Sequence, residues 1–321
     1  MFINKKVVYV LILVILVLSF FYGVNSTKGR AVISKPITFQ DDNLEKVIRE
    51  KIEKKNGEIY IKDLNQITEL NAFNENIHSL NGINHLVNLR KLYLTNNKIK
   101  NLEPLESLEK LEELYLSNNK VTNINSLKNL KELKKLFLSR NQIENITVLK
   151  NLDKLTRLAL AQNQIKNIKS LSNLKNLVFA DLSFNKISNI NSLVKLNKLK
   201  RLLLNRNQIK NIPDFKRLNQ LNFLTLRGNL IENITGLKKL FNLKILDISY
   251  NKINDLNSLK QLKKLEVLDF SSNNISEIIV LKNKSNLEEV FMRKNNLDLT
   301  SDSSDKKIIK KLQSKGVKVY Y

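Results

Sequence analysis

The chain has 321 residues, of which 42% are hydrophobic, and its 55 lysines and arginines outnumber its 30 acidic residues to give a formal net charge of +25. The absence of cysteine excludes disulfides, thiolate metal sites and lipid-modified cysteines, and the presence of only seven glycines disfavours a phosphate-binding loop. The positive balance favours anionic partners or surfaces, although lysines spread all round a repeat would also serve solubility alone.

Residues 1–26 consist of a short basic start, with Lys5 and Lys6, followed by an apolar run over residues 7–24. Basic residues before such a run predict that the N-terminus stays in the cytoplasm and that the rest of the chain is exported. Two alternatives stay open. The run is either a signal peptide cleaved before Thr27, or a retained membrane anchor, in which case only residues 7–24 contact the membrane. Residues 27–37 are expected to form a polar linker.

Residues 38–66 predict a helical N-terminal cap. Asp42 and Glu45 form a capping-box pattern, Gly57 is the predicted end of the helix, and Ile59 and Ile61 are expected in a short strand. The apolar face follows helical spacing through Leu44, Val47, Ile48 and Ile52. We expect this helix to cover the open end of the first coil, because a repeat stack needs a terminal cap.

One asparagine recurs at a constant spacing along most of the remaining chain, at Asn97, Asn119, Asn141, Asn163, Asn185, Asn207, Asn229, Asn251, Asn273 and Asn295. Apolar residues keep fixed offsets from it, and the unit that starts at Leu89 reads LRKLYLTNNKIKNLEPLESLEK. A period of roughly 20 to 29 residues with this pattern is typical of a leucine-rich repeat solenoid. Residues 67–298 therefore predict about ten regular repeats plus one degenerate first coil, over residues 67–89, where Glu75 replaces the asparagine.

The repeat unit predicts a strand, a turn and a return segment. Leucines such as Leu92 and Leu94 are one residue apart and face the same side of a short strand, while later apolar residues at spacings of three suit a 3₁₀ turn or short helix. Cap or first-turn residues open the return segment at Pro104, Ser126, Ser170, Ser192, Asp214, Gly236 and Ser258. The asparagine is expected to satisfy backbone groups at the turn after each strand, and Ala180, which replaces a core leucine, is expected to leave slack.

The predicted fold class is therefore α/β: a right-handed solenoid with short parallel strands on the concave face and 3₁₀ or short helical turns on the convex side. Residues 299–321 are expected to form a C-terminal cap made of a helix and a strand. Capping residues gather at 301–305, Ile308, Ile309 and Leu312 have helical spacing, and Gly316 is the predicted end of the helix. The final strand is predicted from the alternation of Val317, Val319 and Tyr321.

Residues 38–321 resemble bacterial internalin-like leucine-rich repeat proteins in the 22-residue repeats, the capping helix from Asp42 and the ending LDLT…IIKKLQSKGVKVYY. The resemblance implies a secreted or surface-exposed curved solenoid that binds proteins through its concave face. The best-known members also carry an Ig-like domain and surface-attachment modules, which this sequence lacks.

Variable strand positions face the concave side and supply the candidate contact residues. They predict an aromatic strip of Tyr93, Tyr115 and Phe137, and a basic middle of Lys135, Arg140, Arg157, Arg201, Arg206 and Arg227 with Phe179 in the same columns. An apolar stripe of Phe223, Ile245 and Val267 follows, and the column that holds Arg140 and Arg206 also contributes Phe184 and Tyr250. Tyrosine and arginine dominate interface energetics. The alternative is purely structural, because aromatic residues on neighbouring strands stabilise each other by about 0.2–1 kcal/mol per pair.

Three functions fit the sequence. The leading hypothesis is an exported, secreted or cell-surface module that binds a partner protein. The alternatives are electrostatic binding of an anionic envelope polymer or glycan, and a structural surface scaffold without a ligand. No catalytic motif or metal-ligand spacing is present, and the two histidines are expected at the surface, so neither an enzyme nor a cofactor is predicted. Nucleic acid is disfavoured as a partner because the chain is expected to be exported.

Overall fold

A computed structural model describes residues 35–321. The predicted signal peptide or anchor over residues 1–26, and most of the predicted linker, lie outside the described residues. Among residues 35–321, no helix has the length and apolar character needed to cross a membrane.

Residues 37–321 form one compact unit built on a parallel sheet whose strands follow chain order from first to last. The strands are β1 (Glu69–Asn71), β2 (Lys91–Tyr93), β3 (Glu113–Tyr115), β4 (Lys135–Phe137), β5 (Arg157–Ala159), β6 (Phe179–Asp181), β7 (Arg201–Leu203), β8 (Phe223–Thr225), β9 (Ile245–Asp247), β10 (Val267–Asp269), β11 (Glu289–Phe291) and β12 (Lys318–Tyr320). The predicted leucine-rich repeat solenoid is confirmed.

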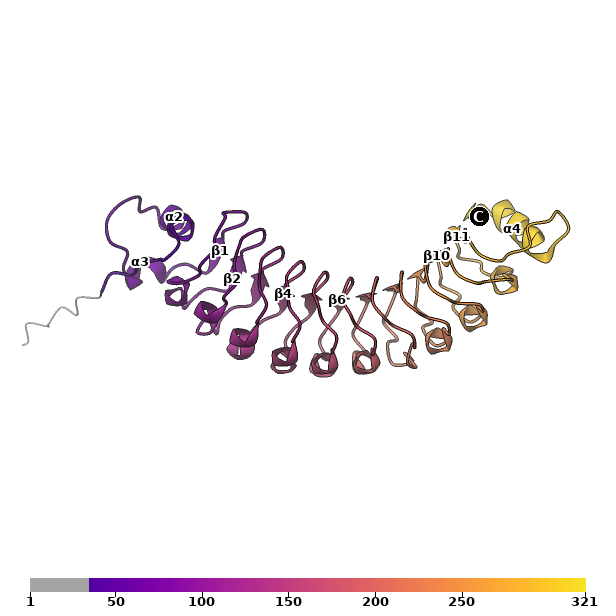
Figure 1. The fold of residues 1–321 in the computed structure, drawn as a ribbon, viewed down its shortest axis with the longest axis horizontal. Coiled ribbons are helices and arrows are strands. Elements are labelled where there is room, and N and C mark those ends of the chain that lie inside the picture. The colour runs from indigo at the N-terminus through magenta and orange to yellow at the C-terminus, as the bar shows by residue number, and fades with distance from the viewer. Residues whose placement is uncertain (1–34) are drawn as a thin grey trace, which may run out of the picture. The chain divides into compact units, whose positions relative to one another are not determined.

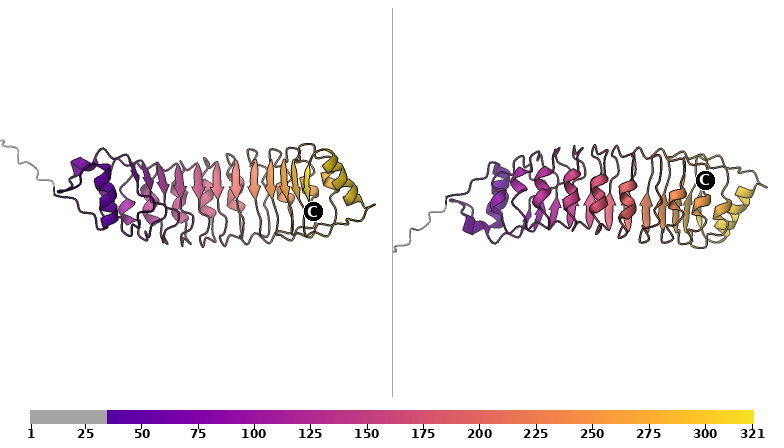
Figure 2. Two further views of the ribbon diagram at one scale, coloured as in Figure 1. Left: turned by 90° about the horizontal axis from the view of Figure 1, so that it is seen from above. Right: turned by 90° about the horizontal axis from the view of Figure 1, so that it is seen from below.

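Short 3₁₀ turns form the return side of most coils. They are η1 (Ile83–His85), η2 (Glu103–Leu105), η3 (Asn125–Asn129), η4 (Thr147–Asn151), η5 (Lys169–Asn173), η6 (Asn191–Lys195), η7 (Thr235–Leu237), η8 (Asn257–Leu259) and η9 (Ile279–Leu281). Within this unit, the strands line the concave side and the 3₁₀ turns line the convex side (Figure 1). The two faces are seen separately in Figure 2, where the strands lie side by side across the concave face.

The strands pair in register because every unit has the same length. Leu92 lies opposite Leu114, and Leu114 lies opposite Leu136. The leucine columns are fully buried, so each coil completes the core of the next, which no single unit could do alone. The strand residues on either side of the central leucine point to the concave surface, with partial exposure at most positions.

The asparagine column is a ladder of side-chain hydrogen bonds. Asn119 is representative: its Oδ1 accepts from the backbone N–H of Ile99 (3.0 Å), and its Nδ2 donates to the carbonyls of Leu94 (2.8 Å) and Leu116 (3.1 Å). The same three bonds recur along the array. Because two of the three partners lie in the preceding coil, each asparagine fastens its own coil to the one before it.

The residue before each ladder asparagine adopts left-handed backbone geometry. Positive φ values of 50° to 68° are found at Asn96, Asn118, Arg140, Gln162, Phe184, Arg206, Gly228, Tyr250, Ser272 and Lys294. We call this set the left-handed column. Glycine and asparagine adopt this geometry readily, whereas bulky residues do so at a cost, so the chain is strained wherever an arginine or an aromatic residue occupies the column.

The N-terminal cap helix, α2 (Asp42–Lys51), starts one residue earlier than the capping-box pattern indicated. Its N-cap is Asp41, whose Oδ1 accepts from the N–H groups of Asn43 (3.1 Å) and Leu44 (3.2 Å). The other carboxylate oxygen accepts from the N–H groups of His78 (2.7 Å) and Ser79 (3.1 Å). Burial raises the pKa of Asp41, but these four hydrogen bonds outweigh burial and lower it. Asp41 therefore both begins the helix and attaches it to the first coil.

Two further predictions in this cap were wrong. The helix ends at Lys51, well before Gly57, because Glu53 already takes the left-handed conformation (φ 54°). Ile59 does form an isolated antiparallel bridge with Ile37, but Ile61 starts a short helix, α3 (Ile61–Leu64), in place of a strand. That helix begins there because the Asp63 carboxylate accepts from the backbone N–H of Tyr60 at 2.9 Å.

The C-terminal cap consists of α4 (Ser304–Ser314), with Ser303 as its N-cap, and β12, which pairs with β11. Ile308, Ile309 and Leu312 are buried, as their spacing predicted. The helix is followed by Gly316 with φ 85°.

The coil between β7 and β8 departs from the pattern. Most of the predicted first-turn residues lie inside 3₁₀ turns, but Asp214 does not, since no 3₁₀ turn forms between those two strands. Here Phe215 replaces a core leucine and is fully buried. The carbonyls of this coil approach the next one so closely that a Cβ on Gly236 would lie 2.3 Å from the Pro213 oxygen. Only glycine therefore fits at position 236.

Candidate functional site

The concave surface gathers all the predicted contact residues on one face, at the outward strand positions and at the turn that follows each strand. None of them is fully buried. The predicted zones differ, however, in how their side chains are paired with one another. Three zones follow one another from the N-terminal to the C-terminal end of the face.

The aromatic strip consists of Tyr93, Tyr115 and Phe137 on β2, β3 and β4. The Tyr93 and Tyr115 rings stack with centroids 4.7 Å apart and an interplanar angle of 14°, and Tyr115 stacks on Phe137 at 4.8 Å and 7°. The Tyr115 hydroxyl also donates to Glu113 at 2.8 Å. Burial, together with this hydrogen bond, raises the pKa of the Tyr115 phenol well above its ordinary value.

Charges around the aromatic strip are neutralised in pairs. Lys135 lies 3.1 Å from Glu113, and Lys91 lies 3.3 Å from Glu69. Burial raises the pKa of Glu113, but hydrogen bonds from Tyr115 and Lys135 outweigh it and lower the pKa. Lys135 therefore belongs to the aromatic strip and not to the basic middle in which the sequence pattern had placed it.

The middle of the face holds a different arrangement, which we call the arginine–aromatic cluster: Arg157, Phe179, Phe184, Arg201, Arg206, Phe223, Arg227 and Tyr250. Each arginine lies over a ring. On the strands, the guanidinium carbon of Arg157 lies 4.8 Å from the centroid of the Phe179 ring, and that of Arg201 lies 4.4 Å from the Phe223 ring. In the turns, the distance is 5.4 Å from Arg206 to Phe184 and 4.1 Å from Arg227 to Tyr250. Arg140 is exposed at the edge of this cluster, in the left-handed column.

The arginines of this cluster have no acidic partners. Among residues 35–321, no carboxylate oxygen lies within 4.0 Å of the side-chain nitrogens of Arg140, Arg157, Arg201, Arg206 or Arg227. Arg227 instead donates from Nη1 to the Ser249 hydroxyl (3.1 Å), which donates to Asp247 (2.6 Å). No arginine of the cluster is thus in a direct ion pair within the described residues, and the nearest link to an acid is the contact of Arg227 with Asp247 through Ser249.

The apolar stripe of Phe223, Ile245 and Val267 lies in register across β8, β9 and β10. All three side chains are partly exposed. Beside the stripe, burial raises the pKa of Asp247, although its hydrogen bonds with Ser249 act in the opposite direction. The stripe continues the cluster toward the C-terminal end, because Phe223 belongs to both.

Two further members of the cluster, Phe184 and Tyr250, lie in the left-handed column, whose variable residues the sequence also placed on the candidate contact surface. Both are exposed, by 44% and 48%. They stand one repeat before Arg206 and one repeat after Gly228 respectively. The sequence did not predict the stack of Phe291 on Tyr320 (4.4 Å, 4°), which joins β11 to the C-terminal strand.

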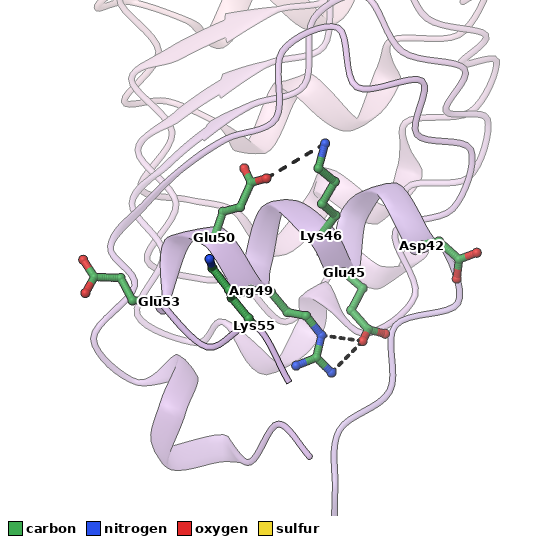
Figure 3. A pocket seen from close by; sticks show the side chains of 7 residues that line it. All are labelled: Asp42, Glu45, Lys46, Arg49, Glu50, Glu53 and Lys55. Atoms are coloured by element: carbon green, nitrogen blue, oxygen red, sulfur yellow. Dashed lines mark hydrogen bonds and ion pairs between the residues drawn. The ribbon is translucent and has the colours of Figure 1, made fainter. Parts of the chain in front are cut away.

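A hollow beside the N-terminal helix offers no comparable chemistry. Figure 3 shows a pocket on the outer side of α2, lined by Asp42, Glu45, Lys46, Arg49, Glu50, Glu53 and Lys55. Its charges pair along the helix, with Arg49 2.8 Å from Glu45 and Lys46 3.9 Å from Glu50, as is usual for a solvated helix face. Within residues 35–321, no group of three or more histidine or acidic side chains is placed to hold a metal ion.

Comparisons with known proteins agree with this architecture. The family described as Leucine Rich repeats (2 copies) matches residues 109–151 and 241–283. An internalin (InlF) from Listeria monocytogenes is 31% identical, with a TM-score of 0.77, and the alignment covers 91% of this chain and 92% of that one.

Two further solved structures share the fold at lower identity. The functional domain of InlJ from Listeria monocytogenes is 24% identical, with a TM-score of 0.69 over 83% of this chain and 65% of that one. A leucine-rich repeat protein from Leptospira interrogans is also 24% identical, with a TM-score of 0.60 over 75% of this chain and 74% of that one. A comparison with curated proteins gives no match.

Proposed function

Because the chain belongs to the internalin-like family of bacterial leucine-rich repeat proteins, we propose that it binds a partner protein through the concave face of its repeats and catalyses no reaction. The observation that carries this proposal is the arginine–aromatic cluster. Exposed aromatic and arginine side chains contribute most to the binding energy of protein interfaces, and the packing of the repeat requires neither type at these outward positions.

The proposal includes export of the repeat array, so that the concave face meets its partner outside the cytoplasm. Its support is the basic start and apolar run of residues 1–24. The partner could then belong to another cell or to the same cell surface.

The test is capture of partner proteins by the immobilised full chain from host-cell and bacterial surface extracts, at low and at high salt. We expect a discrete protein that stays bound at high salt and is lost in Arg157→Glu and in Phe184→Ala. Lys120→Glu is the matched control, because Lys120 is exposed on the turn after β3 and changes charge by the same amount as Arg157→Glu.

The outcome that contradicts the proposal is capture that neither concave substitution affects. Retention of acidic polymers alone, lost at high salt and weakened equally by the Lys120→Glu control, would instead support electrostatic binding by the overall charge of +25.

A further inference from the structure

We infer that the arginine–aromatic cluster recognises an acidic segment of the partner protein, in which an aspartate or glutamate at every third position is separated from the next by apolar residues. This inference rests on the proposed function and names the chemistry of the partner at that site. Three independent features of the described chain support it: the charge pairing, the geometry of the guanidinium groups, and the backbone that places them.

Charge pairing divides the concave face. Elsewhere on this face the lysines of the outward strand positions meet acids on the neighbouring strand: Lys91 meets Glu69, Lys135 meets Glu113, and Lys318 meets Glu289. In the cluster the corresponding positions on neighbouring strands carry rings, because Phe179 follows Arg157 and Phe223 follows Arg201 in the register. Arg157, Arg201, Arg206 and Arg227, which lack an internal carboxylate within residues 35–321, therefore lie together, where an external carboxylate can reach them.

The guanidinium groups are also held in a suitable geometry. A planar guanidinium stacked on a ring keeps its edge N–H groups free, and such a fork binds a carboxylate through two parallel hydrogen bonds. Arg157 and Arg201 stand two strands apart, which is about 10 Å at ordinary strand spacing. A partner in the polyproline II conformation has three residues per turn and rises about 3.1 Å per residue, so every third side chain spans that distance and faces the same side. Its residues between two such acids would lie over Phe179, and those after the second acid over Phe223.

The backbone supplies the third argument. Phe184, Arg206 and Tyr250 occupy the left-handed column, with φ of 56°, 50° and 53°. Asparagine fills the same column at Asn96 and Asn118 and glycine fills it at Gly228, and both adopt this geometry more easily. Strained positions filled by bulky side chains are a mark of function and not of stability. Here the strain places two rings and one guanidinium group on the concave face of the cluster.

The rings favour an acidic protein segment over an anionic polymer. A polymer that binds by charge alone gains nothing from Phe179, Phe184, Phe223 or Tyr250, and would engage the exposed lysines all round the coils equally well. The cluster instead interleaves cationic and apolar groups, which matches a chain whose acidic residues are separated by apolar ones.

The probe is a fluorescein-labelled 15-residue peptide with glutamate at every third position and leucine or tyrosine between, compared with the same peptide carrying glutamine. With the full chain, we expect at least tenfold tighter binding of the glutamate peptide by fluorescence anisotropy. The double variant Arg157→Gln/Arg201→Gln should weaken it at least tenfold and leave binding of the glutamine peptide unchanged.

The matched control is Lys120→Gln/Lys252→Gln, which removes the same charge. Both lysines are exposed on the turn after the ladder, where other coils already carry Gln142, Gln164 and Gln208. This control should change the affinity less than twofold. Equal losses in both double variants, or tighter binding of heparin than of the glutamate peptide, overturn the inference in favour of diffuse attraction.

The experiment separates failure of this inference from failure of the proposed function. Equal binding of both peptides, lost in Phe184→Ala, overturns the acidic chemistry but leaves concave-face binding in place. Failure of both peptides to bind also overturns the inference, and the capture experiment then decides the proposed function through its own variants.

Discussion

The aromatic strip and the arginine–aromatic cluster share the concave face, the strip at the last residue of its strands and the cluster at the first strand residue and in the following turn. They use aromatic side chains in opposite ways. In the strip, rings stack on rings and each neighbouring lysine meets a glutamate. In the cluster, rings lie under arginines that meet no carboxylate within the described residues. The comparison teaches that exposed aromatic residues on a solenoid do not by themselves mark a binding site. What distinguishes the cluster is positive charge beside the rings that no direct ion pair within the described residues neutralises.

One cation of the described chain is neither paired with a glutamate nor stacked on a ring, but buried in the core. Lys284 replaces a core leucine, is 3% exposed, and donates to the carbonyls of Leu262 (2.9 Å) and Lys260 (3.2 Å). Burial lowers the pKa of Lys284 to about 8 from 10.5, so the charged form is destabilised by about 3 kcal/mol. We predict that Lys284→Leu raises the free energy of unfolding by about that amount at pH 7, the largest effect considered.

The stability gained by Lys284→Leu should depend on pH, because the pKa of Lys284 is lower in the folded state than in the unfolded state. Between pH 8 and 10.5 the unfolded state binds the proton that the folded state has lost, so the stability of the natural protein rises with pH over this window. The advantage of Lys284→Leu is therefore full below pH 8 and its pH-dependent part has vanished above pH 10.5. Urea unfolding at pH 7 and pH 10.5 measures this, and a pH-independent difference would show that Lys284 is not buried as a cation.

The sharpest contrast between the two regions is in stability. Tyr115→Ala removes both stacks of the strip and the hydrogen bond to Glu113, which together predict a loss of about 2–3 kcal/mol. Arg157→Ala removes one exposed cation–π contact and predicts a loss of about 0.5–1 kcal/mol. Urea unfolding of the two variants under the same conditions compares them, and a larger loss for Arg157→Ala would reverse the comparison.

The asparagine ladder should contribute equally to stability under the aromatic strip and under the arginine–aromatic cluster. Asn119→Ala, under the strip, and Asn207→Ala, under the cluster, remove the same three hydrogen bonds. Each is expected to lower the free energy of unfolding by about 1–3 kcal/mol, and by similar amounts. Thermal unfolding of both variants checks this, since a clear difference would mean that the outward residues alter the frame as well as the surface.

The smallest predicted effect on stability is that of Phe184→Asn, which should raise the free energy of unfolding but lower the affinity for the glutamate peptide. Phe184→Asn places in the left-handed column a residue that adopts this geometry readily, but loses the contact with Arg206. We expect a gain of up to about 1 kcal/mol in the free energy of unfolding together with weaker binding of the glutamate peptide. Chemical unfolding and anisotropy on one preparation give both numbers, and a variant that is less stable would contradict the strain argument.

Much of the fold could be predicted because leucine and asparagine recur at one period, and a constant period also determines the strand register. The contacts of the candidate site follow the same period in part: Arg157 and Phe179, and likewise Glu113 and Lys135, are one repeat apart in sequence. Local sequence patterns gave the wrong residue where a contact with a distant part of the chain determines the structure. Asp41 and Asp42 are equally good caps in sequence, and only the bonds from His78 and Ser79 favour Asp41.

Other features could not be predicted because they depend on the shape of neighbouring coils. The segment that contains Asp214 forms no 3₁₀ turn, and it packs closely against Gly236 of the following coil. Strain at Phe184 and Tyr250 likewise comes from the turn that the asparagine ladder imposes, and not from the sequence near them.

Every ladder asparagine bonds to the coil before its own, and this affects how the solenoid would yield if its two ends were pulled apart. Each ladder asparagine joins its coil to the preceding one by the same two hydrogen bonds, so tension applied along the stack passes through links in series. Such a series yields first at its softest link. The coil between β7 and β8, which lacks the 3₁₀ turn of its neighbours, is the place where we expect rupture to begin, and it lies directly under Arg201 and Phe223.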